Sequence, residues 1–172
     1  MRSLAGYGST IHFVDSTPER VVVEIAYDGR GGKPPPHLHP SQEERFEVLE
    51  GEINVLLDGE RRTLRAGDTL LVPAGTVHQM WAEQPARQRW ETRPALATER
   101  FFETLWGMQQ DGVLEGDPRN SKLQMAVTMH HFRGEIRMIG LPRAQRAALP
   151  LVAVLARARG LKPEYVPRES GA

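Results

Sequence analysis

The sequence contains no cysteine among its 172 residues. This excludes a disulfide framework, a thiolate metal ligand and a cysteine nucleophile. Basic and acidic residues both number 22, so the formal net charge is zero, which argues against a protein that binds nucleic acid through a basic surface. No apolar run approaches the roughly 18 residues that a membrane-spanning helix needs, and no signal-peptide segment is visible. We therefore expect a soluble, cytoplasmic protein that does not enter membranes.

The length of the chain accommodates one domain with one core. Short runs of alternating apolar and polar residues, separated by turn residues, dominate the first half. Such a pattern predicts an antiparallel sandwich or barrel. The expected strands cover residues 9–14, 20–27, 44–49, 53–58, 61–65, 69–72, 77–82 and 87–93. Asp58-Gly59 is a strong signal for a hairpin turn.

After Pro94 the apolar period changes to that of helices. We expect a helix over residues 97–110, and a second that Ser121 and Gln124 open as a capping box and that runs to about Phe132. A third should cover residues 141–149, where Pro150 breaks or kinks it before residues 151–159 continue. The predicted organisation is thus a β-barrel over residues 1–94 and a helical extension of the same domain over residues 95–172. The apolar stripes of these helices must be buried, either on the outside of the barrel or against a second subunit.

The stretch GGKPPPHLHPSQEERFEVLEG, residues 31–51, carries the chemistry of the chain. His37 and His39 are two residues apart, so an extended chain aims both imidazoles at one side of a sheet. Glu44 opens the next strand, and His78 follows a similar turn in a second strand pair. A lone histidine near prolines is usually a loop residue. Imidazoles together with a carboxylate on adjacent strands instead predict a metal site.

Two further histidines, His130 and His131, fall in the second expected helix. Adjacent helical residues point about 100° apart, so the two cannot face one metal ion. We expect one to be packed and the other solvated. Glu135 is the local carboxylate that a second site would need.

The residues of the two strand pairs resemble the two motifs of the cupin superfamily, in particular a small single-domain cupin. The first motif, G-x5-H-x-H-x(3,4)-E-x6-G, reads here Gly31, His37, His39, Glu44 and Gly51. The second, G-x5-P-x-G-x2-H-x3-N, reads here Gly67, Pro73, Gly75 and His78, with Ala82 in place of the usual Asn. The resemblance covers about half of the chain, residues 20–93. The missing Asn affects the hydrogen bonding expected around the site.

The resemblance implies a mainly β fold, a double-stranded β-helix or jelly-roll barrel, with the C-terminal helices packed outside it. It implies that His37, His39, Glu44 and His78 hold one divalent metal ion in the interior; Fe, Mn, Ni, Cu and Zn all suit such ligands, and the sequence does not choose among them. Strand alternation then places an apolar substrate pocket around the metal, lined by Phe46, Val48, Met80 and Ala82.

A metal-dependent enzyme acting on a small organic molecule is the first functional hypothesis. The site resembles that of quercetin-cleaving cupins, which suggests a dioxygenase, and Lewis-acid chemistry such as isomerisation is also open. Glu44 could double as the catalytic proton acceptor. The alternative is a cupin that binds or senses a small molecule and catalyses nothing, because one fold hosts many functions.

A third hypothesis, in which the helices contact DNA, rests on Arg143, Arg146, Arg157 and Arg159. The zero net charge opposes it, and such arginines more often form a solvated face. We also expect a homodimer, because the edge strands of a barrel must be covered and related cupins commonly pair.

Overall fold

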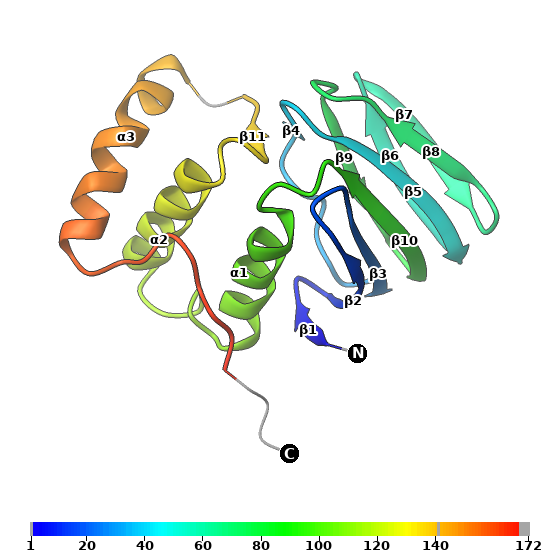
Figure 1. The fold of residues 1–172 in the computed structure, drawn as a ribbon, viewed down its shortest axis with the longest axis horizontal. Coiled ribbons are helices and arrows are strands. Elements are labelled where there is room, and N and C mark those ends of the chain that lie inside the picture. Colours follow the sequence, from blue (N-terminus) through cyan, green and yellow to red (C-terminus); the bar gives the residue numbers. More distant parts are fainter. Residues whose placement is uncertain (1, 141, 169–172) are drawn as a thin grey trace.

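Two antiparallel sheets form the body of the protein (Figure 1), as the computed structural model describes it for residues 2–140 and 142–168. The first sheet has the strand order β1 (Ser3–Gly6), β2 (Ser9–Ser16), β3 (Val21–Asp28), β10 (Pro85–Arg93), β5 (Glu43–Glu50) and β8 (Thr69–Val72). The second has the order β11 (Arg137–Met138), β4 (His37–Leu38), β9 (His78–Trp81), β6 (Glu52–Leu57) and β7 (Glu60–Arg65). From β3 to β10 the chain crosses repeatedly between the two sheets, and only β6 and β7 follow one another within one sheet, as expected for the predicted double-stranded β-helix.

Three helices lie to one side of the sheets (Figure 1): α1 (Thr98–Gln110), α2 (Pro118–His131) and α3 (Arg143–Ala158). The predicted packing of the C-terminal helices outside the barrel is thus confirmed. Within the described residues, none of the helices is long and apolar enough to span a membrane. The boundary predicted near residue 94 stays a prediction, and the extension returns one strand, β11, to the second sheet.

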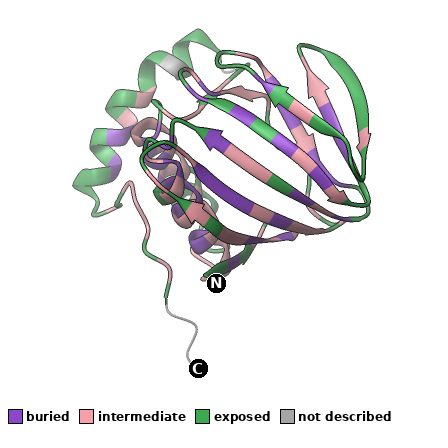
Figure 2. Ribbon diagram, turned by 45° about the vertical axis from the view of Figure 1, so that its right-hand side comes forward, coloured by how far each residue is buried: buried purple, intermediate pink, exposed green. Residues whose placement is uncertain are grey.

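Burial alternates along several of the strands (Figure 2), and one face of the first sheet contributes to both main apolar clusters. On β5 the buried residues are every second one, which includes Glu44, Phe46 and Val48. Toward β2 and β3 this face is covered by α1, through Phe101 and Phe102. Toward β5 it meets the second sheet, through Ile53 and Val55. Burying each such side chain contributes about 1.5–3 kcal/mol relative to exposing it.

Several sequence predictions need correction. The short strands β1 and β11 were not predicted, because strands of four and two residues are too short to show a period. The predicted capping box is wrong: α2 begins at Pro118, where the Asp117 side chain accepts a hydrogen bond from the Arg119 amide at 2.9 Å. Ser121 instead lies inside that helix.

The third helix also differs from the prediction. It begins at Arg143 and continues through Pro150, which lies on an exposed side of α3, so this proline does not end the helix. Leu141, the predicted first residue, lies outside the described residues. The segment after Pro163 is anchored as far as Arg168: the Arg168 backbone amide and the Tyr165 hydroxyl both donate to Asp111 at 2.8 Å.

Close backbone approaches explain two glycines of the first motif. A Cβ on Gly31 would lie 2.4 Å from the Tyr7 carbonyl oxygen, so the loop leading to His37 rests directly on the β1–β2 turn. Gly51 joins β5 to β6 with a φ of 73°, and a Cβ there would lie 2.6 Å from the Pro85 carbonyl oxygen. Both positions therefore require the absence of a side chain.

Gly51→Ala should destabilise the protein more than Gly59→Ala. Gly59 has a φ of 87° in an open turn, with nothing within 4 Å of its added Cβ, so alanine there should cost only the left-handed backbone penalty, about 1–2 kcal/mol. At position 51 the collision with Pro85 adds to that cost. Urea denaturation of both variants measures the difference, and equal losses of unfolding free energy would contradict the argument.

Candidate metal centre

Strand pairing brings the predicted site residues together from both sheets. His37 on β4 lies directly opposite His78 on β9 in the second sheet, and His39 comes immediately after β4. One nitrogen from each of these three histidines lies within 4.8 Å of the others. Glu44 enters from β5 in the first sheet, where it is paired with Val72 and Thr92. The cluster therefore exists only where the two sheets face each other.

Glu44 contacts two of the imidazoles through different oxygens. Its Oε2 lies 2.9 Å from His78 Nε2, and its Oε1 lies 3.1 Å from His39 Nε2. Glu44 is 1% exposed, His78 2% and His39 6%, whereas His37 is partly exposed. Since burying a charged carboxylate is costly without compensation, this cluster needs a positive charge at its centre.

Backbone carbonyls fix the orientation of two imidazoles. His37 Nδ1 lies 2.9 Å from the Pro35 carbonyl oxygen, and His78 Nδ1 lies 3.1 Å from the Thr76 carbonyl oxygen. A carbonyl oxygen only accepts, so each Nδ1 carries the proton and donates it. In the neutral rings Nε2 is then the atom with a free lone pair. This is the arrangement that holds histidine ligands in metal sites.

The remaining polar atoms of the cluster fit a metal ion. Within the described residues, neither nitrogen of His39 has a hydrogen-bond partner, and Glu44 Oε2 has none with hydrogen-bond geometry. Such buried atoms without partners are rare in folded proteins. The lone pair of a neutral His78 and the Glu44 carboxylate repel each other at 2.9 Å unless a proton or a cation lies between them. Nitrogen and oxygen donors in this number suit a divalent transition metal.

Burial and neighbouring charges shift the pKa values of Glu44 and the three histidines in different directions. Burial acts to raise the pKa of Glu44, but the neighbouring His39 and His78 together outweigh burial and hold that pKa below its ordinary value. Burial acts to lower the pKa of His78, but the close Glu44 carboxylate and the Thr76 carbonyl oxygen together outweigh burial, and the pKa is raised. Burial, and then the neighbouring His78, lower the pKa of His37 to about 4, and burial also lowers that of His39. At neutral pH the cluster thus offers a carboxylate and at least two neutral imidazoles.

The residues predicted to line a substrate pocket lie in the barrel interior. The Phe46 ring centroid is 6.4 Å from that of His78. Val48 and Ala82 are buried in one apolar cluster, against which Met80 packs. Their role as a pocket lining stays a prediction. Ala82, which replaces the usual Asn, contributes no polar group beside the site.

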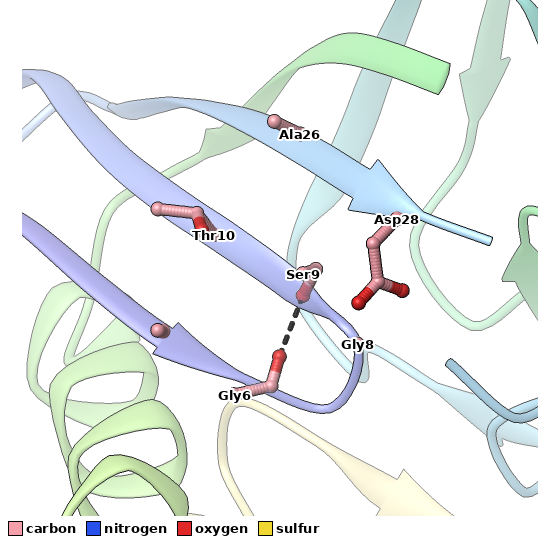
Figure 3. A pocket seen from close by; sticks show the side chains of 7 residues that line it. Gly6, Gly8, Ser9, Thr10, Ala26 and Asp28 are labelled. Atoms are coloured by element: carbon pink, nitrogen blue, oxygen red, sulfur yellow. Dashed lines mark hydrogen bonds between the residues drawn. The ribbon is translucent and has the colours of Figure 1, made fainter. Parts of the chain in front are cut away.

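Two surface hollows lie away from this cluster. One, of about 240 Å³, is lined by small residues of the β1–β2 turn and by Asp28 (Figure 3), and Ser9 donates to the Gly6 carbonyl oxygen there at 2.8 Å. The other, of about 340 Å³, lies outside the barrel beside Ser41 and Pro73. Neither is lined by any of the four site residues, so neither extends the candidate metal centre.

The second histidine pair takes no part in this site. His131 Nε2 lies 2.8 Å from Glu164 Oε1, and both His130 and His131 are partly exposed. The sequence suggested Glu135 as the carboxylate neighbour, whereas the structure supplies Glu164 from the segment after α3. The pairing could not be predicted from local sequence, because His131 and Glu164 are far apart in the chain.

Sequence reasoning placed Trp90 in a strand but missed its contact with the site. Its indole Nε1–H donates to Glu44 Oε1 at 3.0 Å. Trp90 lies opposite Phe46 in the pairing of β10 with β5, so it shares the buried face of Glu44. This contact follows from the register of β10 on β5, two strands separated by about forty residues. The alternation of side chains within one strand does not reveal that register.

Comparison with known proteins agrees with this geometry. Residues 24–90 match the sequence model of the family described as the cupin domain. Quercetin 2,3-dioxygenase of Bacillus subtilis is 38% identical over 63 residues, which cover 37% of this chain and 19% of that protein. The oxidoreductase macE of Penicillium terrestre is 33% identical over 104 residues, which cover 51% of this chain and 39% of that protein. The chain thus spans well under half the length of these curated relatives.

Solved structures show the same barrel. KdgF from Halomonas sp. is 29% identical, with a TM-score of 0.50, over 54% of this chain and 84% of that one. An RmlC-like cupin from Shewanella frigidimarina is 25% identical, with a TM-score of 0.52, over 57% of this chain and 87% of that one. The likeness thus covers little more than half of this chain.

The metal-free protein should lose stability between about pH 6.5 and pH 4, partly because of His37. The pKa of His37 is about 4 in the folded protein, whereas it is about 6.5 when unfolded. The unfolded chain therefore binds an extra proton in this range, which costs stability as the pH falls. His37→Gln should flatten this dependence by at most about 1.4 kcal/mol per pH unit.

Urea denaturation of both proteins in chelator, from pH 8 to pH 4, measures this. At pH 8 His37 is neutral in the folded and in the unfolded protein. The difference in unfolding free energy between wild type and His37→Gln at pH 8 is therefore the reference for the differences at lower pH. An unchanged slope in the variant would contradict the lowered pKa.

Proposed function

Because this chain belongs to the cupin superfamily through its residues 24–90, we propose that it is a metal-dependent enzyme that acts on a small organic molecule. In this proposal His37, His39, Glu44 and His78 bind one divalent transition metal ion. The observation that carries it is the buried cluster itself, in which three histidine nitrogens lie within 4.8 Å of one another beside a carboxylate. Such a group costs free energy to bury unless a cation joins its members.

The favoured reaction is dioxygenation of an enolic or aromatic compound. The likeness to a quercetin 2,3-dioxygenase and to oxidoreductases supports it. A redox-active metal in this site would supply activation of dioxygen and polarisation of the substrate oxygen. Both oxygen atoms then enter the organic product, so no external reductant is consumed.

The residues of the chain have separate roles in this proposal. The backbone contacts of His37 and His78 keep their Nε2 atoms directed at the centre. Glu44, with its lowered pKa, is ionised at neutral pH and accepts the proton of the substrate hydroxyl if it leaves the metal. Phe46, Val48, Met80 and Ala82 exclude water from the reacting atoms. The partly exposed His37 marks the side from which substrate enters.

One observation favours a second candidate, a cupin that binds or senses a small molecule without turnover. Phe46, Val48 and Ala82 are at most 2% exposed, so the predicted pocket lining is closed to solvent. In that case the cluster would bind metal and a ligand, and no product would form. The test below separates the two candidates.

Protein purified without chelator and without added metal should contain close to one transition metal ion per chain. His39→Ala should lose most of this metal, because it removes a buried ligand whose ring nitrogens have no hydrogen-bond partner among the residues that the structure describes. His131→Ala is the matched control, since His131 pairs with Glu164 outside the barrel. Elemental analysis measures the metal, and equal content in wild type and His39→Ala would refute the site.

Oxygen consumption with enolic and aromatic compounds then tests the reaction on the same three proteins. Uptake should follow metal content, being lost in His39→Ala and kept in His131→Ala. Tight ligand binding without oxygen uptake or product would favour the binding protein. Zinc as the native metal would redirect the search to isomerase, lyase or hydrolase chemistry.

A homodimer is a further part of this proposal. On α3 the apolar side chains of Leu151 and Val154 are 64% and 61% exposed, which supports a covered helix face. Light scattering should give about twice the mass of one chain. The variant Leu151→Glu/Val154→Glu should lower that mass, and a monomeric wild type would contradict the dimer.

A further inference from the structure

We propose that Trp90 is the residue that positions Glu44 for metal binding. In this proposal, the packing of helix α1 against the Trp90 ring helps to fix the position of Glu44. The inference rests on the proposed role of Glu44 as a metal ligand. Trp90 donates its indole Nε1–H to Glu44 Oε1 at 3.0 Å. In the described part of the chain, this carboxylate also forms close polar contacts with His39 and His78, both proposed ligands themselves. When those imidazoles bind metal, the indole remains as the donor to Glu44.

An indole N–H is suited to this role. It is a donor only and does not titrate, so it holds the carboxylate oxygen at any ordinary pH. A hydrogen bond to a charged acceptor is also stronger than one between neutral groups. With Oε1 occupied by Trp90, Oε2 is the oxygen left for the metal. That oxygen has no hydrogen-bond partner with suitable geometry within the described residues.

The ring of Trp90 is held on both sides. Its centroid is 5.3 Å from that of Phe46, and 4.7 Å from that of Phe102. Phe102 belongs to α1 and is 1% exposed, so it cannot move without disturbing the main cluster of the core. The backbone of Trp90 is paired with strands on both sides, opposite Val23 on β3 and Phe46 on β5.

A continuous chain of contacts therefore leads from the helical extension to the site: Phe102 packs on Trp90, and Trp90 donates to Glu44. The extension lies largely outside the matched family segment, which ends at residue 90. The helix thus does more than cover an apolar face of the sheet. It fixes the ring whose N–H sets the position of the carboxylate.

Trp106 provides a matched control within the same cluster. Its indole Nε1–H also donates, to Ser9 Oγ at 3.2 Å, and its ring also packs against Phe102, with centroids 5.8 Å apart. Both indoles are partly buried. Replacing either by phenylalanine keeps an aromatic ring in the core, but only Trp90→Phe removes a donor to Glu44.

The first measurement uses metal-free protein and NMR of the tryptophan indole N–H groups. Glu44→Gln should shift the Trp90 indole resonance, because it replaces a charged acceptor by a neutral one, and should leave that of Trp106 in place. A Trp90 resonance that does not respond would overturn the inference whether or not the protein binds metal.

The second measurement is the dissociation constant for Zn²⁺ and for Mn²⁺, titrated against a chromophoric chelator. Losing a group that orients a ligand typically weakens metal binding about 10- to 100-fold. Trp90→Phe should therefore raise the dissociation constant at least about tenfold, and Phe102→Leu by a smaller factor. Trp106→Phe should leave the dissociation constant unchanged, although we expect this variant to lower the unfolding midpoint about as much as Trp90→Phe does.

Equal weakening in Trp90→Phe and Trp106→Phe would reduce the role of Trp90 to core packing and overturn the inference. Absence of metal binding by the wild-type protein would instead refute the proposed function. The two failures are distinguishable, because the NMR response of Trp90 to Glu44→Gln is measured without metal.

Discussion

The structure depends on one electrostatic constraint: a carboxylate and three imidazoles are held together where two sheets meet. Glu44 is nearly inaccessible to water and lies 2.9 Å from His78. In an apolar interior these groups are tolerated only with compensating charge and hydrogen bonds. The contacts that surround them, from the Pro35 and Thr76 carbonyl oxygens and from the Trp90 indole, supply part of that compensation.

The remainder of the fold serves to keep these groups in register. The loop before His37 passes against the β1–β2 turn so closely that Gly31 tolerates no side chain. β11, from the helical extension, pairs with β4 and so supports the strand that carries His37. Buried Gln42 donates to the Pro94 and Ala95 carbonyl oxygens, which ties the ligand segment to the start of α1. The site is therefore rigid because elements from both halves of the chain meet at it.

The helical extension lies beyond the segment that matches the cupin-domain model, which ends at residue 90. The solved cupins align with little more than half of this chain. Helix α1 completes the core of the first sheet through Phe101 and Phe102, whereas α2 and α3 pack mainly on each other, through Val127, Ala153 and Ala156. α1 is thus part of the same core as the barrel, and the outer pair forms a separate small cluster. The extension therefore reaches the site in two places, through α1 beside Trp90 and through β11, which pairs with the strand of His37.

Alternation and turn residues predicted an antiparallel sandwich or barrel with its hairpins, and the resemblance of the two motifs narrowed this to a barrel that holds the four residues of the cluster. Local patterns carry this information: the alternation of β5, the Asp58-Gly59 turn and the spacing of His37, His39, Glu44 and His78. The exact helix limits depended on capping by Asp117 and on tolerance of Pro150 at an exposed position, which local rules weigh poorly. Only the tertiary structure decided that Trp90 binds Glu44, that Glu164 pairs with His131 and that β11 joins β4. These contacts join residues far apart in sequence, and their register is set by how whole sheets and helices pack, which no local period encodes.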